Sequence, residues 1–376
     1  MKLRNKILKF LSVATLSLAI GTTSFTGGSI STTEKVQASK TDALSTATFA
    51  YLDVGQGNAE LIKAGKKTIL IDTGKGSEYD ELEYQLKKLK VSKINTLVIS
   101  HPDADHMENA DDIINDYGVK KVIMPKISAT TQCYNRLLSA IKAKKVKTVH
   151  PEIGDTLKFA KECKAKVLSV DASSSDKNEA SIVMRVTYGT KSFLYMGDAT
   201  AKVESDILDS GETVSSDVYL MSHHGSDTAN GILFQRKVLS SGDKIAVISV
   251  GKDNPYGHPD NNVVNRANRF AKSVYRTDKK GAIIFKTDGK KLKKSFIKVT
   301  HSSSGHSSSS NSNDHRHTNS QSSNASNSST TSTYVYVTNT GSKYHKAGCR
   351  YLSQSKIRMK LSDAKAAGYE PCNVCY

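Results

Sequence analysis

Acidic and imidazole side chains gather within six positions of this chain, at His101, Asp103, Asp105 and His106. So many ionisable groups held close together would repel one another and shift their pKa values, and a divalent cation removes that repulsion. An isolated Asp after a strand usually caps a helix or closes a turn. The density of donor groups here instead predicts a metal site.

Each group of candidate ligands follows an apolar run that is typical of a buried strand. The cluster that begins at His101 follows residues 97–100. The three other groups also follow such runs and consist of Asp72, of Asp198, and of His223 with His224. Side chains just past strand ends project into the cleft above a sheet, where loops gather them around a metal. We therefore expect these four groups to form one site.

The elements that must position these residues begin at Thr48. Short apolar or alternating runs predict strands at residues 48–54, 59–63, 68–72, 96–100, 121–124, 181–188, 192–196, 218–222, 246–250, 282–286 and 296–299. Helical spacing predicts helices at residues 80–90, 110–117, 135–144 and 232–239. Strands interleaved with helices predict an α/β domain over residues 48–300, with two mixed sheets covered by outer helices.

The first residues predict a secreted protein. Four basic residues lie within the first nine positions, an apolar run follows at residues 10–20, and Val36-Gln37-Ala38 offers a small-x-small cleavage site. This order is typical of a signal peptide over residues 1–38, followed by a loose leader at residues 39–47. The alternative, a retained membrane anchor, needs about 20 apolar residues. We expect no transmembrane segment in the mature chain.

The chain is strongly basic, with a formal net charge of +18. Residues 1–38 carry five basic and one acidic side chain, so the mature chain keeps a charge of +14. Outside a cell, the polyanions that attract such a protein are nucleic acid and anionic wall polymers. The alternative is that the charge serves solubility, because lysines such as Lys142, Lys144 and Lys145 also suit a solvated helix face.

The end of the chain predicts a small metal-stabilised module. Residues 301–333 are almost wholly Ser, Asn, Thr and His, a composition that cannot fold and that predicts a flexible linker. Residues 334–376 contain the ligand types of a structural zinc site, namely His345, Cys349, Cys372 and Cys375. A domain of this size needs such support; the alternative is one disulfide and a free thiol. Cys133 and Cys163 are either paired or, as we favour, buried as small apolar residues.

Five motifs carry a resemblance to a known family. They are LDVGQGN (residues 52–58), SHPDADH (100–106), GDA (197–199), SHHGS (222–226) and SVG with YGHP (249–259). Their order and spacing resemble the metallo-β-lactamase superfamily, and most closely the extracellular hydrolase domain of the ComEC late-competence DNA-uptake family. The resemblance covers about residues 47–299 and implies an αββα sandwich, without the membrane channel of those proteins. Residues 344–375 resemble the short Ada-type zinc-binding modules of some secreted nucleases.

The resemblance also implies two divalent metals. His101 and Asp103 would serve the first metal, Asp198 would bridge the pair, and the ligands of the second would be Asp105, His106 and His224. The usual motif, His-x-His-x-Asp-His, has a histidine where this chain has Asp103. No third histidine precedes Ser181, since only Asp176, Asn178 and Glu179 stand there. The first site is therefore oxygen-rich or incomplete, so manganese competes with zinc, or a single metal binds tightly.

Two metals about 3.5–4 Å apart can hold a hydroxide and stabilise the oxygens of an in-line displacement at phosphorus. We expect Asp105 and Asp72 to orient that nucleophile. His258 is expected to protonate the leaving oxygen or to hold a phosphate. His223 either does the same or makes a structural hydrogen bond. The weaker candidates for contact with substrate are Lys75, Asn178 and Ser226.

We interpret the chain as a secreted metal-dependent nuclease or phosphodiesterase, expected to be a monomer, that acts on extracellular DNA. Residues 334–376 carry seven basic and two acidic side chains, so this module is expected to tether the enzyme to nucleic acid through phosphate contacts. Two alternatives stay open. One is a wall-associated phosphoesterase of the choline or teichoic-acid type, and the other is a non-catalytic DNA-binding protein with a vestigial metal site.

Overall fold

A computed structural model describes residues 44–240, 242–299, 334–338, 342–347, 349–352, 357–366 and 369–376. The predicted signal peptide at residues 1–38 and the predicted linker at residues 301–333 lie outside these ranges. Within the ranges that the structure describes, no helix has both the length and the apolar character that a membrane span requires.

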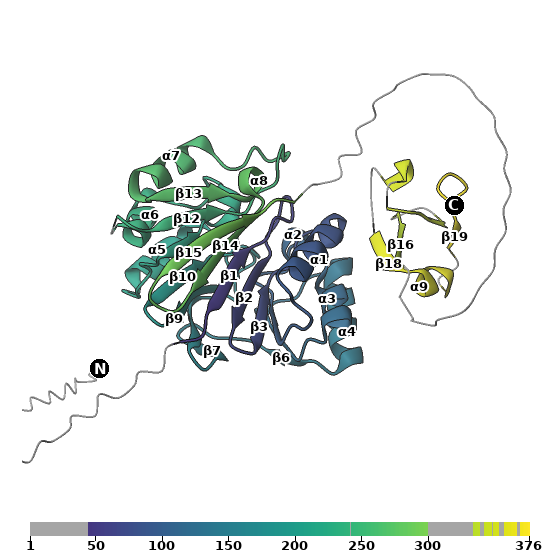
Figure 1. Ribbon diagram of the computed structural model, residues 1–376, viewed down its shortest axis with the longest axis horizontal. Helices are drawn as coiled ribbons and strands as arrows, with labels where there is room; N and C mark the ends of the chain where they lie inside the picture. Colours follow the sequence, from purple (N-terminus) through teal and green to yellow (C-terminus); the bar gives the residue numbers. More distant parts are fainter. Residues whose placement is uncertain are drawn as a thin grey trace, which may run out of the picture. The chain divides into compact units, whose positions relative to one another are not determined.

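Two mixed β-sheets form the centre of the large domain (Figure 1). The first has the strand order β15-β14-β1-β2-β3-β4-β5-β6. Its strands are β1 (Ala47–Tyr51), β2 (Glu60–Ala64), β3 (Lys67–Ile71), β4 (Thr96–Val98), β5 (Lys121–Ile123), β6 (Lys147–Val149), β14 (Ala282–Thr287) and β15 (Leu292–Ile297). The second has the order β13-β12-β11-β10-β9-β8-β7. Its strands are β7 (Thr156–Ala160), β8 (Cys163–Ser169), β9 (Val183–Tyr188), β10 (Lys191–Tyr195), β11 (Val218–Leu220), β12 (Ile245–Ile248) and β13 (Ser273–Arg276).

Helices cover the outer face of each sheet (Figure 1). The first sheet carries α1 (Tyr79–Lys88), α3 (Ala110–Tyr117) and α4 (Gln132–Lys144), and the second carries α5 (Ala201–Asp209), α6 (Ile232–Leu239) and α7 (Asn261–Phe270). The shorter helices are η1 (Gly76–Glu78), α2 (Ala104–Met107), η2 (His223–Gly225) and α8 (Thr277–Lys280). Between the sheets, the rings of Phe49 and Phe193 stack with centroids 3.6 Å apart. This arrangement confirms the predicted αββα sandwich.

The buried apolar residues of the large domain form three clusters, one between the sheets and one between each sheet and its helices. Alternation of side chains along the strands explains this division. In β1, Phe49 and Tyr51 point into the layer between the sheets, whereas Ala50 faces the helices on the other side. A strand that is buried on both faces therefore appears as a continuous apolar run. The edge strand β15 is mostly exposed and includes Lys293 and Lys294, whose charges discourage pairing with another sheet.

The structure confirms most of the predicted elements and adds several. The helices α3 and α6 have the predicted bounds, and the hairpin around Gly189 is present as β9 and β10. Among the elements that the sequence patterns did not predict are β7, β8, α5 and α7. Cys133 and Cys163 are buried in separate apolar clusters and are unpaired, so the preferred interpretation of these two cysteines is confirmed.

The described residues after 333 form two small pairs of strands. β16 (Tyr334–Val337) pairs antiparallel with β18 (Ile357–Lys360), and β17 (Lys343–Tyr344) pairs in parallel with β19 (Glu370–Pro371). The short helices are η3 (Arg350–Leu352) and α9 (Leu361–Ala366). The buried apolar residues form two clusters of four, a core that is small for independent stability.

Candidate metal centre

The candidate site lies where the carboxyl ends of parallel strands meet. β3 pairs in parallel with β4, and β10, β11 and β12 are parallel neighbours in the second sheet. Asp72, His223 and His224 follow such strands with left-handed backbone conformations, at φ of 55°, 48° and 55°. Non-glycine residues adopt these conformations at a cost, so they are found where the surrounding structure fixes a functional side chain.

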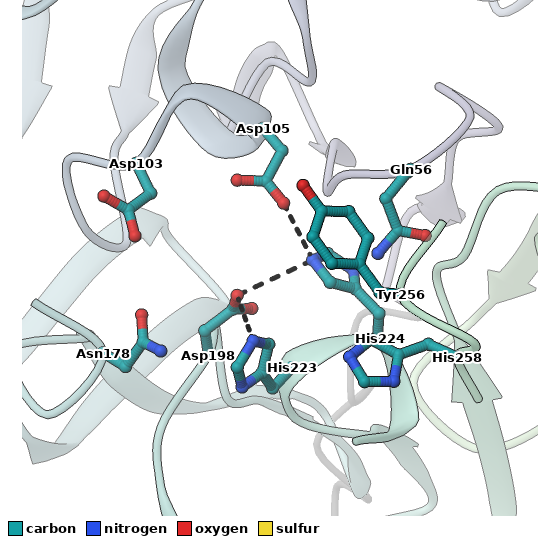
Figure 2. A pocket seen from close by; sticks show the side chains of 9 residues that line it. All are labelled: Gln56, Asp103, Asp105, Asn178, Asp198, His223, His224, Tyr256 and His258. Carbon is teal, nitrogen blue, oxygen red and sulfur yellow. Dashed lines mark hydrogen bonds and ion pairs between the residues drawn. The ribbon is translucent and has the colours of Figure 1, made fainter. Parts of the chain in front are cut away.

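Four donor side chains converge at this edge. Asp105, His106, Asp198 and His224 each offer one ligand atom, and these atoms all lie within 4.8 Å of one another. His106 Nε2 is 3.1 Å from Asp198 Oδ1, and His224 Nε2 is 3.1 Å from Asp105 Oδ2 and 3.6 Å from Asp198 Oδ2. Figure 2 shows Asp105 and Asp198 both directed at the same nitrogen of the His224 ring. Two imidazoles and two carboxylates are a donor set that suits zinc or manganese.

The hydrogen bonds of the two rings leave their Nε2 atoms available to a cation. His224 Nδ1 lies 3.0 Å from the carbonyl oxygen of Ser249, and a carbonyl only accepts, so Nδ1 carries the proton. His106 Nδ1 lies 2.8 Å from Asp72 Oδ2 and is fixed in the same way. In the neutral rings, each Nε2 therefore presents a lone pair to a carboxylate oxygen about 3 Å away. Such facing acceptors need a cation or a proton between them.

Asp72 orients imidazoles and does not face substrate. Its side chain is fully buried and accepts hydrogen bonds from the Ser100 amide at 2.7 Å, the Ser100 hydroxyl at 2.6 Å and His106 Nδ1. Because the Ser100 hydroxyl donates to Asp72, it accepts from His101 Nδ1 at 3.1 Å. These contacts do not fit the prediction that Asp72 orients the nucleophile directly, because Oδ1 accepts from the Ser100 amide and Oδ2 accepts from the Ser100 hydroxyl and His106. Oδ2 fixes the tautomer of His106 directly and that of His101 through the Ser100 hydroxyl.

The charges at the site shift its pKa values in opposite directions. Burial opposes the charged carboxylate of Asp198, but His106 and His224 outweigh this effect and hold the pKa of Asp198 well below its usual range. Burial also opposes the imidazolium of His106, yet nearby carboxylates, led by Asp198, raise its pKa well above normal. Burial and the neighbouring His106 lower the pKa of His101 to about 4. The site therefore favours charged carboxylates beside a positive centre.

The buried side chain of Asn230 holds the turn that carries His223 and His224. Asn230 Oδ1 accepts a hydrogen bond from the Ser222 amide at 3.1 Å, and its Nδ2 donates to the carbonyls of Ser222 and Ser226, each at 2.9 Å. The amides of Asn230 and Gly231 donate in turn to the Glu204 carboxylate, at 2.7 and 2.8 Å. Burial raises the pKa of Glu204 to about 7. This network fixes the left-handed turn without using a metal ligand.

The donor atoms of His101 and Asp103, the residues predicted for the first metal, converge less closely than those of the four-donor set. His101 is buried, with its Nε2 3.7 Å from Asp103 Oδ2 and 4.0 Å from Asp198 Oδ2. Asp103 also forms an ion pair with Lys177, whose Nζ lies 2.8 Å from Asp103 Oδ1. Among the described residues, His101 and Asp103 belong to neither of the converged donor sets. Lys177, whose ammonium pairs with the Asp103 carboxylate, lies just before Ser181. This is the segment in which the family resemblance implies a third histidine.

A cavity of about 180 Å³ opens over the donor set. The residues that line it are Gln56, Asp103, Asp105, Asn178, Asp198, His223, His224, Tyr256 and His258 (Figure 2). His223 is partly exposed, with its Nε2 3.7 Å from Asp198 Oδ2. Burial and the neighbouring His223 lower the pKa of His258. Both histidines therefore face the space above the donor set, as predicted for residues that exchange protons with a substrate.

The predicted substrate contacts divide into two groups. Asn178 lines the cavity, and Lys75 lies near its rim beside the ring of Tyr256. Ser226 is buried and its hydroxyl contacts Thr228 Oγ1 at 3.0 Å, away from the cavity lining, so this prediction is wrong.

Gln56 and Tyr256 line the cavity but were not among the predicted site residues, although both lie within motifs that carry the family resemblance. Gly57 explains why the loop with Gln56 approaches the site. A Cβ at Gly57, whose φ is +149°, would lie 2.4 Å from the carbonyl oxygen of Asp105. The neighbouring Asn58 amide donates to that same oxygen at 3.1 Å. The glycine therefore allows this loop to pack directly on the backbone of a predicted ligand.

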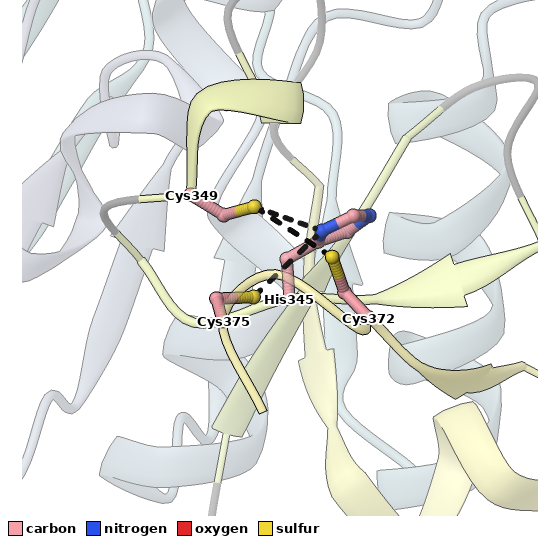
Figure 3. Close-up of side chains that lie close together, drawn as sticks. All are labelled: His345, Cys349, Cys372 and Cys375. Atoms are coloured by element: carbon pink, nitrogen blue, oxygen red, sulfur yellow. Dashed lines mark hydrogen bonds between the residues drawn. The ribbon is translucent and has the colours of Figure 1, made fainter.

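A second donor set lies in the C-terminal module, where His345, Cys349, Cys372 and Cys375 converge (Figure 3). The Cys349 and Cys372 sulfurs are 3.9 Å apart, and His345 Nδ1 is 3.2 Å from Cys349 Sγ and 3.9 Å from Cys375 Sγ. A disulfide needs sulfurs about 2.05 Å apart, and these thiols are unpaired. Ligands at about 2.3 Å from a tetrahedral zinc lie about 3.8 Å from each other, which matches this spacing.

Comparison with known proteins connects this geometry to one superfamily. The family model described as the metallo-beta-lactamase superfamily matches residues 52–272. Competence relatives match the same part of the chain. ComE operon protein 3 of Bacillus subtilis is 27% identical over 254 residues, which cover 62% of this chain and 32% of that protein. Recombination protein 2 of Haemophilus influenzae is 30% identical over 240 residues, which cover 62% of this chain and 28% of that protein. The chain thus spans about a third of the length of these relatives.

Among solved structures, the metallo-beta-lactamase fold protein YhfI of Bacillus subtilis is 12% identical, with a TM-score of 0.47, over 65% of this chain and the whole of that chain.

Proposed function

Because the chain belongs to the metallo-beta-lactamase superfamily, we propose that this hydrolase is a secreted phosphodiesterase that cleaves extracellular DNA. The observation that carries the proposal is the set of two carboxylates and two imidazoles, of which Asp105, Asp198 and His224 line an open cavity. The names of its relatives, a competence operon protein and a recombination protein, favour DNA as the substrate. A mature charge of +14 favours a polyanion.

The metals are proposed from the donor chemistry. A zinc or manganese ion at Asp105, His106, Asp198 and His224 would lower the pKa of a water toward 7 and polarise a phosphoryl oxygen. His101 and Asp103, together with Asp198, would form the weaker first site. Its low nitrogen content and its oxygen donors favour manganese there over zinc.

Proton transfer is assigned to the two histidines on the cavity wall. The ring of His223 has one nitrogen 3.2 Å from the Thr228 hydroxyl and the other facing Asp198. His223 also lines the cavity, so it is placed to donate a proton to the leaving oxygen of a bound substrate. The lowered pKa of His258 keeps this ring neutral near pH 7. His258 is thus suited to donate a neutral hydrogen bond and not to serve as a fixed cation for phosphate.

The four donors of the C-terminal module are proposed to hold one structural zinc. The basic side chains of this module would then bind the phosphates of DNA and keep the enzyme near its substrate. Binding of a 30-nucleotide DNA to the whole chain between about 50 and 200 mM salt tests this role, because counterion release predicts a steep loss of affinity. Affinity that is independent of salt would contradict the tether.

The test of the main proposal is cleavage of linear and circular DNA by the chain without residues 1–38, in Mn²⁺ or Zn²⁺. Asp105→Asn removes one ligand oxygen, and Asp209→Asn makes the same change at an exposed position on α5. We expect cleavage by the parent and by Asp209→Asn but not by Asp105→Asn. Turnover of a small choline or teichoic-acid phosphodiester without DNA cleavage would favour a wall phosphoesterase. Binding of DNA without any turnover would favour a non-catalytic protein.

A further inference from the structure

Tyr256 is an exposed aromatic side chain at the mouth of the catalytic cavity. It lines the same cavity as Asp105 and Asp198, yet 60% of the residue is accessible to solvent. Figure 2 shows its ring across the opening, in front of His224. Large aromatic side chains usually bury their surface, so burial in the core does not explain the position of this ring.

The loop that carries Tyr256 is fixed by its own hydrogen bonds. Asn254 Nδ2 donates to the carbonyls of Gly251 at 3.0 Å and of His258 at 2.6 Å, and Asn254 Oδ1 accepts from the amides of Tyr256 and His258. A Cβ at Gly251 would lie 2.5 Å from the amide nitrogen of Gln56, so the start of the loop packs closely on a second loop of the site. The backbone that carries the exposed ring is therefore held in place by the protein itself.

A cation accompanies the ring. Lys75 Nζ lies 5.6 Å from the centroid of the Tyr256 ring, and the carbonyl of Lys75 accepts a hydrogen bond from buried Asn109 Nδ2 at 2.6 Å. The ring of His258 is nearly parallel to that of Tyr256, at 16° with centroids 6.1 Å apart. A flat aromatic surface and an ammonium group are thus presented together beside the predicted hydrolytic centre.

We propose that Tyr256 and Lys75 form a nucleotide subsite, in which the ring stacks against one unpaired base and the ammonium contacts a neighbouring phosphate. The inference rests on the proposed function and adds how the substrate is recognised. Aromatic rings bind bases of any sequence because every base has a flat π-face, and lysines follow the phosphate backbone. A base within a duplex is stacked on both sides, so this subsite favours single-stranded DNA or a frayed end.

The position of Lys75 also argues against a quaternary ammonium ligand. A choline group binds aromatic rings through its positive charge. Lys75 already places a positive charge 5.6 Å from this ring, and a second cation on the same ring would be repelled. A neutral base next to a negative phosphate suits this pair of side chains better than a choline phosphoester does.

The experiment compares two single-stranded oligonucleotides of equal length in Mn²⁺, one with normal bases and one with abasic sites around the cleavage position. We measure the ratio of kcat/KM for the two substrates in the parent, Tyr256→Leu, Tyr256→Phe and Lys75→Gln. The control is Tyr84→Leu, since Tyr84 is another exposed tyrosine with a lysine, Lys88, 5.2 Å from its ring centroid, and it lies outside the cavity.

We expect the parent to prefer the normal oligonucleotide by roughly 5- to 150-fold, the range for one stacked base. Tyr256→Leu should bring this ratio close to one, whereas Tyr256→Phe and Tyr84→Leu should retain it. Lys75→Gln should lower kcat/KM for both substrates and weaken its salt dependence. A fluorescent base at the cleavage position should lose its quenching only in Tyr256→Leu.

Two outcomes would overturn the subsite. One is an unchanged substrate ratio in Tyr256→Leu, and the other is turnover of glycerophosphocholine that depends on Tyr256. Absence of cleavage of both oligonucleotides by the parent would instead refute the proposed nuclease function.

Discussion

Removal of the Lys177 ammonium should strengthen metal binding at His101 and Asp103. Lys177 Nζ lies 2.8 Å from Asp103 Oδ1, and both side chains are between a third and a half exposed. A cation that binds Asp103 must therefore compete with an ammonium that already neutralises this carboxylate. Lys177→Ala removes the competitor and leaves the carboxylate in place.

The magnitude follows from two contributions. An exposed ion pair contributes about 0.2 to 1 kcal/mol, and this free energy is lost when a metal displaces the ammonium. A divalent ion on the same carboxylate would lie about 5 Å from Nζ, where repulsion in a water-like dielectric is about 1.7 kcal/mol. These two contributions apply to alternative states of the ammonium and are not added. The decrease in Kd is therefore about 2- to 5-fold if the metal displaces the ammonium, and up to about 20-fold at low salt if the ammonium stays.

Calorimetric titration of the metal-free chain with Mn²⁺ measures this change, because thiolates of the C-terminal module prefer softer ions. The parent should show one tight and one weak Mn²⁺ site, and Lys177→Ala should tighten the weak one. Lys166→Ala is the matched control, since Lys166 forms a similarly exposed ion pair with Glu212, at 3.7 Å. A weak-site Kd that changes less than twofold in Lys177→Ala would refute the reasoning.

Three further predictions concern positioning, pH and the C-terminal module. Asp72→Asn should weaken metal binding at the four-donor set by about 10- to 100-fold, as for other residues that hydrogen-bond a ligating histidine. Calorimetric titration measures this change, and an unchanged Kd would argue against the positioning role of Asp72. Burial raises the folded-state pKa of Glu204 from 4.5 to about 7, so its contribution to stability is full below about pH 4.5 and is lost as the pH rises through 7. Urea unfolding of the metal-free chain should therefore show a steeper decline in stability from pH 5 to 7.5 than in Glu204→Gln, and equal declines would contradict this pKa. Cys372→Ser should lose one zinc per chain, measured by elemental analysis, and its C-terminal module should become sensitive to protease. Turnover of a small phosphodiester should persist, and retention of the full zinc content would exclude Cys372 as a ligand.

The convergence of Asp105, His106, Asp198 and His224 could be predicted from the sequence, because each group of donors follows a strand with a clear apolar pattern. Parallel strands bring their carboxyl ends to shared edges, so Asp198 and His224 were expected near the His101 motif before their distances were known. Helical spacing, another local pattern, predicts α3 and α6 with their observed bounds. Local patterns suffice when burial and chain direction together determine where a side chain lies.

The elements that were missed have weak local patterns. In β8, lysines alternate with Cys163 and Ala165, and such small apolar side chains are a poor signal for a strand. The helix α7 is rich in asparagine, with Val263 and Ala267 as its buried residues, so its intrinsic helix propensity is low. Tertiary packing, and not intrinsic propensity, stabilises both elements. The small apolar residues of β8 pack in the layer between the sheets, and the buried residues of α7 pack against the second sheet.

The roles of individual site residues depend on contacts between distant segments. Asp72 and Asp105 are both acids near a strand end, but only the structure shows that Ser100 and His106 occupy the oxygens of Asp72. Likewise, nothing local to Lys177 predicts an ion pair with Asp103, 74 positions away in the chain. Side-chain partners of this kind follow from tertiary structure and are not encoded in a motif.

The balance of charge at the site should couple the affinity for a second metal ion to the affinity for an anionic substrate. A divalent ion at the four-donor set would neutralise Asp105 and Asp198, and Lys177 neutralises Asp103, so a second divalent ion would leave an excess positive charge in the cavity. Under the proposed function, a phosphodiester would bring a negative charge to the same cavity and offset that excess. Because binding of two ligands is reciprocal, DNA should raise the affinity of the first site for Mn²⁺, and Mn²⁺ should raise the affinity for DNA. Lys177, which pairs with Asp103, would thus favour a first site that is completed by an anionic substrate and is weakly occupied without one.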